Sequence, residues 1–225
     1  MRINKYIAQE FGCSRREADK WIEKGWVTVN GNPPEPGQQV ESDSDTVAVT
    51  DLAKSTQTNA IVIAFHKPRG IVTNCPQEDE KEITDLLPKK YKHLNSIGRL
   101  DKDSEGLILL TDSGAVARHY LNADIPHERV YEVTVGRPIM PDQLRALEDG
   151  LPILGQMTLP LTVEKLSPKQ ILMTMREGKN RQIRRMLLKL GLRVTRLVRL
   201  QFDQTTLDGL AAGEYRDEHN IPPRH

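Results

Sequence analysis

Short β-rich runs recur along the chain from residue 61 onward, and helical segments separate them without a regular strand–helix alternation. This order favours an α+β sheet domain, mixed and mainly antiparallel, over βαβ winding. The longest apolar run, Gly106–Thr111, is typical of a buried strand. Strands are predicted at 61–65, 107–111, 130–135, 161–164, 171–175 and 194–200, and helices at 115–122, 141–149 and 181–190.

Residues 1–50 predict a separate small unit with the order helix, helix, strands. Gly12 suits the end of a first helix, and Ser14 with Glu17 matches a capping box that begins a second. Asn30 and Gly31 indicate a type I′ turn. Polar residues 51–60 are then expected to form a linker, 61–217 a second domain and 218–225 a flexible tail.

Composition narrows where such a chain works. No apolar run approaches the ~20 residues that span a bilayer, and the first residues lack a signal-peptide core. Cys13 and Cys75 stand outside any C-x-x-C pair, and the six histidines form no zinc-site pattern. We therefore expect a cytoplasmic protein that contacts no membrane and holds no metal.

The net charge of +1 conceals a strong asymmetry. Nine Lys/Arg face Glu177 alone within Arg176–Arg199, so this segment carries +8 and the rest of the chain −7. A cluster of one sign indicates an anionic partner, although a solvated charged helix has the same composition.

The segment Gly98–Leu107 is the sharpest candidate for chemistry. An Asp-, Ser- and Gly-rich surface turn would have this composition. Asp101, Asp103 and Asp112 also fall at positions 1, 3 and 12 of an EF-hand-like register. That calcium-loop match is partial, because position 12 is not Glu and no second copy exists.

A third interpretation comes from resemblance. Gly98–Asp101 with Ser104 and Gly106-Leu107 resembles the central motif of RNA pseudouridine synthases. His66–Gly70 is similar to the first motif of that family, Arg129-Val-Tyr131 to its Lys-x-Tyr element, and Glu177–Met186 to its third motif. Ser14–Ala18 and Val29–Gly31 resemble an S4 RNA-binding domain. Together these segments resemble the branch with small-subunit synthase A and large-subunit synthases B, E and F, most of all the F type.

The resemblance implies a fold and a set of catalytic roles. It implies an S4-like domain followed by a synthase domain, with Asp101 as the catalytic residue. Arg184 would pair with that carboxylate, and Tyr131 would stack on the target base or assist removal of the C5 proton. No cofactor is implied.

The residues agree with that chemistry. Converting uridine into pseudouridine breaks the N1–C1′ bond, rotates the base and joins C5 to C1′, without a redox step. A carboxylate such as Asp101 could add to the electron-poor sugar, neutralise it, or remove the C2′ proton to give a glycal. Burial disfavours a charged carboxylate, and a guanidinium beside it opposes that effect.

The expected partner is structured RNA. 23S rRNA is the principal candidate, a tRNA is an additional one, and a monomer is expected. The S4-like unit would govern which RNA is bound. The alternative is a non-catalytic S4-type RNA-binding or ribosome-assembly factor. RNA contacts are expected from Arg15, Arg16, Lys20, Lys67, Arg69, Arg99, Leu100, Lys102, Arg181, Gln182, Ile183 and Arg185.

Overall fold

The computed structural model describes residues 1–35, 37–55, 60–122 and 124–218 and divides into two compact units. The described part of the first comprises Met1–Val62 and Thr111–Leu121. The second comprises Ile63–Leu110 and Asn122–Glu218. The segment 219–225, most of the expected tail, lies outside the described residues. Within the described ranges, no helix is long and apolar enough to cross a membrane.

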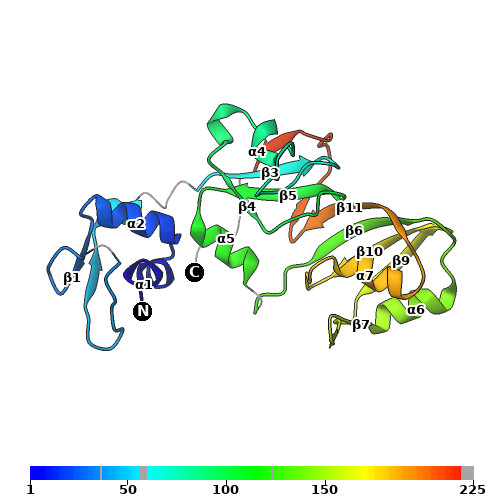
Figure 1. Ribbon diagram of the computed structural model, residues 1–225, viewed down its shortest axis with the longest axis horizontal. Helices are drawn as coiled ribbons and strands as arrows, with labels where there is room; N and C mark the ends of the chain where they lie inside the picture. Colours follow the sequence, from blue (N-terminus) through cyan, green and yellow to red (C-terminus); the bar gives the residue numbers. More distant parts are fainter. Residues whose placement is uncertain (36, 56–59, 123, 219–225) are drawn as a thin grey trace. The chain divides into compact units, whose positions relative to one another are not determined.

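The first unit is built from short helices and a two-stranded sheet (Figure 1). A buried cluster with Ile7, Ala18 and Trp21 at its centre holds these elements together. The elements are α1 (Ile3–Glu10), α2 (Arg15–Glu23), β1 (Val27–Val29), β2 (Val47–Val49), α3 (Asp51–Ser55) and α5 (Gly114–Leu121).

The local signals of this unit are confirmed. Ser14 Oγ accepts a hydrogen bond from Glu17 N at 3.0 Å, and Glu17 Oε2 accepts one from Ser14 N at 2.6 Å. Asn30 and Gly31 both have positive φ, 52° and 81°, as a type I′ turn requires. Gly12, with φ 71°, follows the end of α1.

Helix α5 belongs to the first unit although it is distant in sequence. A Cβ atom on Gly114 would lie 2.3 Å from Ser14 Cβ, so only glycine permits this approach. The Arg118 guanidinium donates to Cys13 O. Burial raises the pKa of the Cys13 thiol to about 12.

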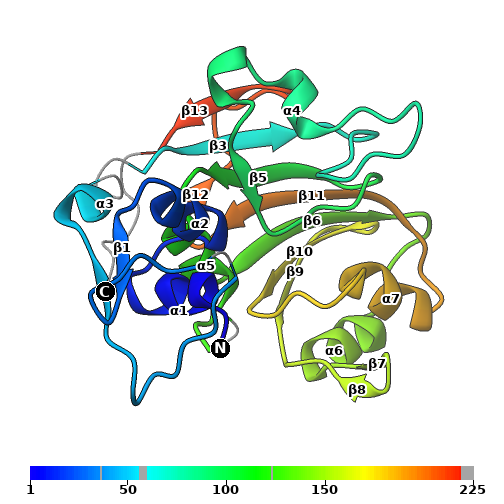
Figure 2. The same cartoon turned by 60° about the vertical axis from the view of Figure 1, so that its left-hand side comes forward.

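The second unit is centred on a mixed sheet (Figure 2). Within the described residues, nine strands take part in it, in the order β13-β3-β5-β11-β6-β10-β9, with β12 beside β11 and β4 beside β5. Strands β5 and β11 pair in parallel, whereas β11–β6, β6–β10, β10–β9 and β13–β3 pair antiparallel. The prediction of an α+β, mixed and mainly antiparallel sheet is therefore confirmed. The strands are β3 (Val62–Lys67), β4 (Asn95–Ile97), β5 (Glu105–Thr111), β6 (Arg129–Val135), β9 (Thr162–Ser167), β10 (Gln170–Met175), β11 (Val194–Phe202), β12 (Thr205–Thr206) and β13 (Tyr215–Asp217).

Helices and a small hairpin accompany this sheet. Figure 2 shows α6, α7, β7 and β8 gathered on the side of β9 and β10. Gly191, with φ 72°, ends α7 as predicted. These elements are α4 (Ile83–Leu86), a 3₁₀ turn η1 (Lys89–Tyr91), α6 (Pro141–Asp149), β7 (Pro152–Ile153), β8 (Gln156–Met157) and α7 (Gln182–Lys189).

Two expectations about local structure were wrong. The segment expected as an unstructured linker contains α3, in which Ala53 is fully buried. The third-motif helix begins at Gln182, because Arg181 takes a left-handed conformation with φ 50°. Arg181 is therefore not part of the helical face shared by Arg185 and Lys189.

Candidate active site

Asp101 lies in the loop that joins β4 to β5, and a buried threonine fixes this loop. Thr73 Oγ1 donates to Leu100 O at 2.7 Å and accepts from Leu100 N at 3.1 Å. Gly70 N donates to Lys102 O at 2.7 Å on the other side of Asp101. The peptide units before and after the carboxylate are thus both held by the segment that follows β3.

Arg181 connects the loop to the start of α7. Its Nη1 lies 3.2 Å from Asp101 Oδ2, and its two terminal nitrogens each lie 3.0 Å from an oxygen of Asp103. The hydrogen bonds from Arg181 lower the pKa of Asp103, and the same bonds raise the pKa of Arg181. One guanidinium therefore bridges both carboxylates, in a forked geometry toward Asp103.

Arg184 has a different place from the one that the sequence predicts. Its side chain is only 13% exposed, and its Nε lies 3.3 Å from Asp103 Oδ2. Its Nη2 donates to Asp103 O at 2.8 Å and to Ser104 Oγ at 3.1 Å. In the described part of the chain Arg184 therefore pairs with Asp103, and Arg181 is the partner of Asp101. The one-turn offset follows from the left-handed residue before α7.

Lys67 is buried beneath the same loop. Its ammonium donates to Pro68 O at 2.9 Å and to Ile71 O at 2.7 Å, and its side chain has no exposed surface. Burial lowers the pKa of Lys67 to about 8, and the charges of Asp101, Asp103 and Glu105 oppose that shift. Of the two roles expected for Lys67, the structure supports steadying the loop.

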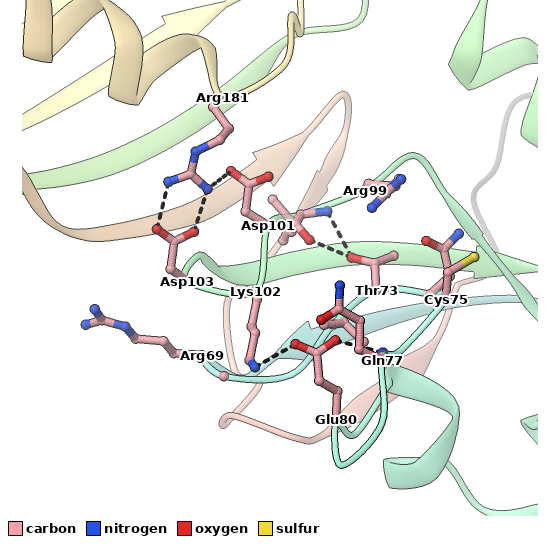
Figure 3. A pocket seen from close by; sticks show the side chains of 14 residues that line it. Arg69, Thr73, Cys75, Gln77, Glu80, Arg99, Asp101, Lys102, Asp103 and Arg181 are labelled. Carbon is pink, nitrogen blue, oxygen red and sulfur yellow. Dashed lines mark hydrogen bonds and ion pairs between the residues drawn. The ribbon is translucent and has the colours of Figure 1, made fainter.

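A pocket of about 570 Å³ opens beside Asp101. Figure 3 shows Arg181 reaching over to Asp101 and Asp103 on one side, with Glu80 and Lys102 on another. Lys102 Nζ donates to Glu80 Oε1 at 2.7 Å. Five of the residues predicted from the sequence line this pocket, namely Arg69, Arg99, Leu100, Lys102 and Arg181.

The comparisons with known proteins agree with this geometry. Residues 61–189 match the family described as RNA pseudouridylate synthase, and residues 1–47 match the S4 domain. The chain is 40% identical over 219 residues to the dual-specificity RNA pseudouridine synthase RluF of Escherichia coli strain K12, covering 96% of this chain and 75% of that protein. The chain belongs to the RNA pseudouridine synthase family.

Two further similarities place this synthase within the family. It is 33% identical over 222 residues to the ribosomal small subunit pseudouridine synthase A of Pasteurella multocida, covering 96% of this chain and 95% of that protein. A crystal structure of a pseudouridylate synthase matches with a TM-score of 0.71 and 29% identity, over 97% of this chain and 96% of that one. The resemblance to the branch with S4 domains is thus confirmed.

Tyr131 of the synthase lies on β6 and is 8% exposed. It is paired across the sheet with Arg199 on β11 and Met173 on β10. It is not among the residues that line the described pocket. The structure therefore places Tyr131 in the sheet and does not bring it to the wall of the pocket.

Three residues predicted to contact RNA are buried. Leu100 is 7% exposed, Gln182 is 3% and Ile183 is 5%. Gln182 Nε2 donates to Glu177 Oε1 at 2.6 Å, and its Oε1 accepts from Lys179 N at 2.9 Å. These side chains therefore stabilise the loop and the start of α7, and direct RNA contact by them would require the fold to open.

The remaining predicted cations are exposed. Arg15, Arg16 and Lys20 lie on α2 of the first unit, with their side chains open to solvent. Arg185 is exposed on α7 and donates to Asn180 O at 3.0 Å. These positions are free to meet RNA phosphates.

The calcium-loop interpretation meets a cation already in place. The carboxylates of Asp101 and Asp103 face the Arg181 guanidinium. Among the described residues, no three His, Cys, Asp or Glu side chains are arranged to hold a metal ion.

Thr73 and Glu80 are site residues that the sequence reasoning missed. Thr73 follows an ordinary turn, and nothing in its spacing indicates that it would contact Leu100. Asp103 was noted only as part of a calcium register, although its spacing of two from Asp101 placed both carboxylates in one loop.

Proposed function

We propose that this synthase isomerises uridine at a defined position of a structured RNA, principally 23S rRNA, with Asp101 as the catalytic residue. The observation that carries the proposal is the placement of Asp101. Its carboxylate is 34% exposed at the pocket, 3.2 Å from Arg181, in a loop whose backbone is held on both sides. The proximity of Arg181 favours the ionised form that the reaction requires.

The reaction needs no external reagent. Cleavage of N1–C1′ leaves an electron-poor sugar facing Asp101, which adds to C1′, neutralises it, or removes the C2′ proton to give a glycal. The base turns, C5 bonds to C1′, the C5 proton is released and N1 gains a proton. The balance of atoms is therefore an isomerisation, and the chain's task is to position and stabilise charge.

The target uridine must leave its stack before Asp101 reaches C1′. Base flipping costs a few kcal/mol and costs least in loops and bulges, so we expect a target in such a region. Arg99 and Lys102 flank Asp101 and line the pocket, where they are placed to hold the vacated position and nearby phosphates. We assign Tyr131 to the base, which requires it to be reached when the RNA is bound.

The 23S assignment rests on similarity. The chain is 40% identical to the dual-specificity synthase and 33% identical to the small-subunit synthase. This difference supports a substrate other than 16S rRNA, with tRNA as an additional one. We further propose that the synthase acts as a cytoplasmic monomer.

We also propose that the S4-like unit selects the RNA. Arg15, Arg16 and Lys20 are exposed on α2 and would contact phosphates. Deleting residues 1–50 would uncover α5, because Gly114 and Arg118 contact that segment. The better test replaces the three cations by Gln. RNA affinity should fall and its salt dependence weaken, while the rate at saturating RNA is retained. Equal losses in affinity and rate would contradict this division.

Release of tritium from 5-³H-uridine-labelled transcripts tests the catalytic proposal. Wild type, Asp101→Asn and the matched Asp103→Asn are compared on 23S rRNA, 16S rRNA and tRNA. We expect release by wild type, none by Asp101→Asn with RNA binding retained, and reduced but measurable release by Asp103→Asn. If wild type binds these RNAs and releases nothing, the non-catalytic S4-type binding factor is the correct function.

A further inference from the structure

The hairpin formed by β7 and β8 presents a leucine where folding favours another residue. Leu154 and Gly155 form its two-residue turn, with φ values of 51° and 77°. Such a turn favours Asn and Gly, because a side chain with a large Cβ substituent is strained at positive φ. Leu154 is also 58% exposed. Neither backbone preference nor burial accounts for a leucine at this tip.

The hairpin is attached to the helix that begins at the active site. Lys189 Nζ, near the end of α7, donates to Pro152 O at 2.9 Å. Lys179 Nζ, before the start of α7, donates to Met157 O at 3.4 Å. The hairpin and α7 therefore form one structural element within the second unit, and Figure 2 shows them together.

A second exposed leucine lies on α7. Leu188 is 68% exposed, the largest exposed fraction among the large hydrophobic side chains of the described residues. At 3.6 residues per turn it shares the outer side of the helix with Arg184 and Arg185, while Met186 and Leu187 are buried. We use the term α7–hairpin surface for Leu154, Met157, Arg185, Leu188 and Lys189.

The charge of this surface indicates its occupant. It lies within or beside the segment Arg176–Arg199, whose formal charge is +8. Cations interleaved with exposed apolar side chains match a nucleic acid strand, whose phosphates bind the cations while its bases offer apolar faces. From Arg181, which contacts Asp101, to Lys189 the helix extends about 12 Å. An RNA strand entering the pocket would therefore lie within reach of Leu154 and Leu188.

We propose that the α7–hairpin surface is a second RNA contact, in which Leu154 and Leu188 pack against unpaired bases flanking the target uridine. The proposal rests on the proposed function of the synthase and extends its substrate footprint beyond the pocket. The two leucines supply apolar contact area, and Arg185 and Lys189 bind the adjoining phosphates. The strain and exposure of Leu154 are then the cost of a binding contact.

The decisive variant is Leu154→Asn, because its two expected effects have opposite signs. Asn suits a left-handed turn position, so the melting temperature should stay the same or rise. The Kd for a 23S rRNA transcript should rise about three- to tenfold, as expected for losing apolar contact area. Leu188→Gln should raise Kd similarly while keeping helix propensity. For both, the rate at saturating RNA should be unchanged.

Salt dependence separates the apolar contacts from the ionic ones. Leu154→Asn and Leu188→Gln should leave the slope of log Kd against log salt unchanged, whereas Arg185→Gln should reduce it by about 0.7–0.9. Leu166→Gln on β9, where the leucine is 46% exposed, is the matched control and should bind normally. Unchanged affinity in both leucine variants, with wild type active, would overturn this inference alone. Binding without tritium release by wild type would instead overturn the proposed function.

Discussion

Arg181, the residue before the first turn of α7, holds its guanidinium 3.2 Å from the carboxylate of Asp101. The same group binds Asp103 with both terminal nitrogens at 3.0 Å. Arg184, one turn later, reaches Asp103 and Ser104 instead. The third motif thus supplies two arginines with separate tasks, one toward the catalytic carboxylate and one toward the loop that carries it.

Substituting these two arginines should separate chemistry from stability. Arg181→Gln removes the charge beside Asp101 but is 41% exposed, so the free energy of unfolding should change by at most about 1 kcal/mol. Its rate of tritium release should fall at least tenfold. Arg184→Gln leaves Ser104 Oγ and Asp103 O without their donor in a site that is 13% exposed, and should cost about 1–3 kcal/mol. Urea unfolding and single-turnover kinetics on both variants test this, and equal effects on stability would contradict it.

Thr73 should be important for the rate through the geometry of the loop. Thr73→Val leaves the N–H and C=O of Leu100 buried without a partner, which should cost about 1–3 kcal/mol and lower the rate at saturating RNA. Thr73→Ser keeps the hydroxyl and should restore most of the rate. A Thr73→Ser variant as slow as Thr73→Val would show that the methyl group, and not the hydrogen bonds, is what matters.

Much of the fold could be predicted from the sequence because its signals are local. The Ser14–Glu17 capping box, the Asn30–Gly31 turn and the end of α7 at Gly191 depend on residues close in sequence, and all three are confirmed. Strands β4, β7, β8, β12 and β13 were not predicted, since two or three residues carry no periodic pattern.

The site could be predicted only in part. The residue types in Gly98–Leu107 indicated Asp101, but the partner of its carboxylate depends on the left-handed conformation of Arg181, φ 50°, which helical periodicity does not reveal. Alternation along β6 predicted that Tyr131 lies in a strand. It did not predict which neighbours cover the ring, because those come from β10 and β11.

Lys67 makes stability depend on pH in a defined window. Its pKa of about 8 in the folded protein is below the ordinary 10.5, so between these values the unfolded chain binds more protons. The contribution of Lys67 to the free energy of unfolding therefore rises as pH increases from 8 to 10.5. The difference in unfolding free energy between wild type and Lys67→Met should grow over this window. A difference that stays flat or shrinks would contradict the lowered pKa.

Gly106 should tolerate no side chain, because β5 and β11 approach closely beside it. A Cβ atom there would lie 2.3 Å from Arg199 O and 2.5 Å from Arg199 N, and its φ of +110° is unfavourable for other residues. Gly106→Ala must separate the only parallel strand pair reported for this sheet in the described residues, at the point where the Asp101 loop enters β5. We expect a loss of more than about 2 kcal/mol in stability together with a large loss of activity. Gly136→Ala is the matched control, since a Cβ there meets Thr195 Cγ2 at an ordinary 3.9 Å, and it should change stability by less than about 1 kcal/mol. Thermal unfolding and tritium release on both variants check the prediction, and an active, stable Gly106→Ala would contradict it.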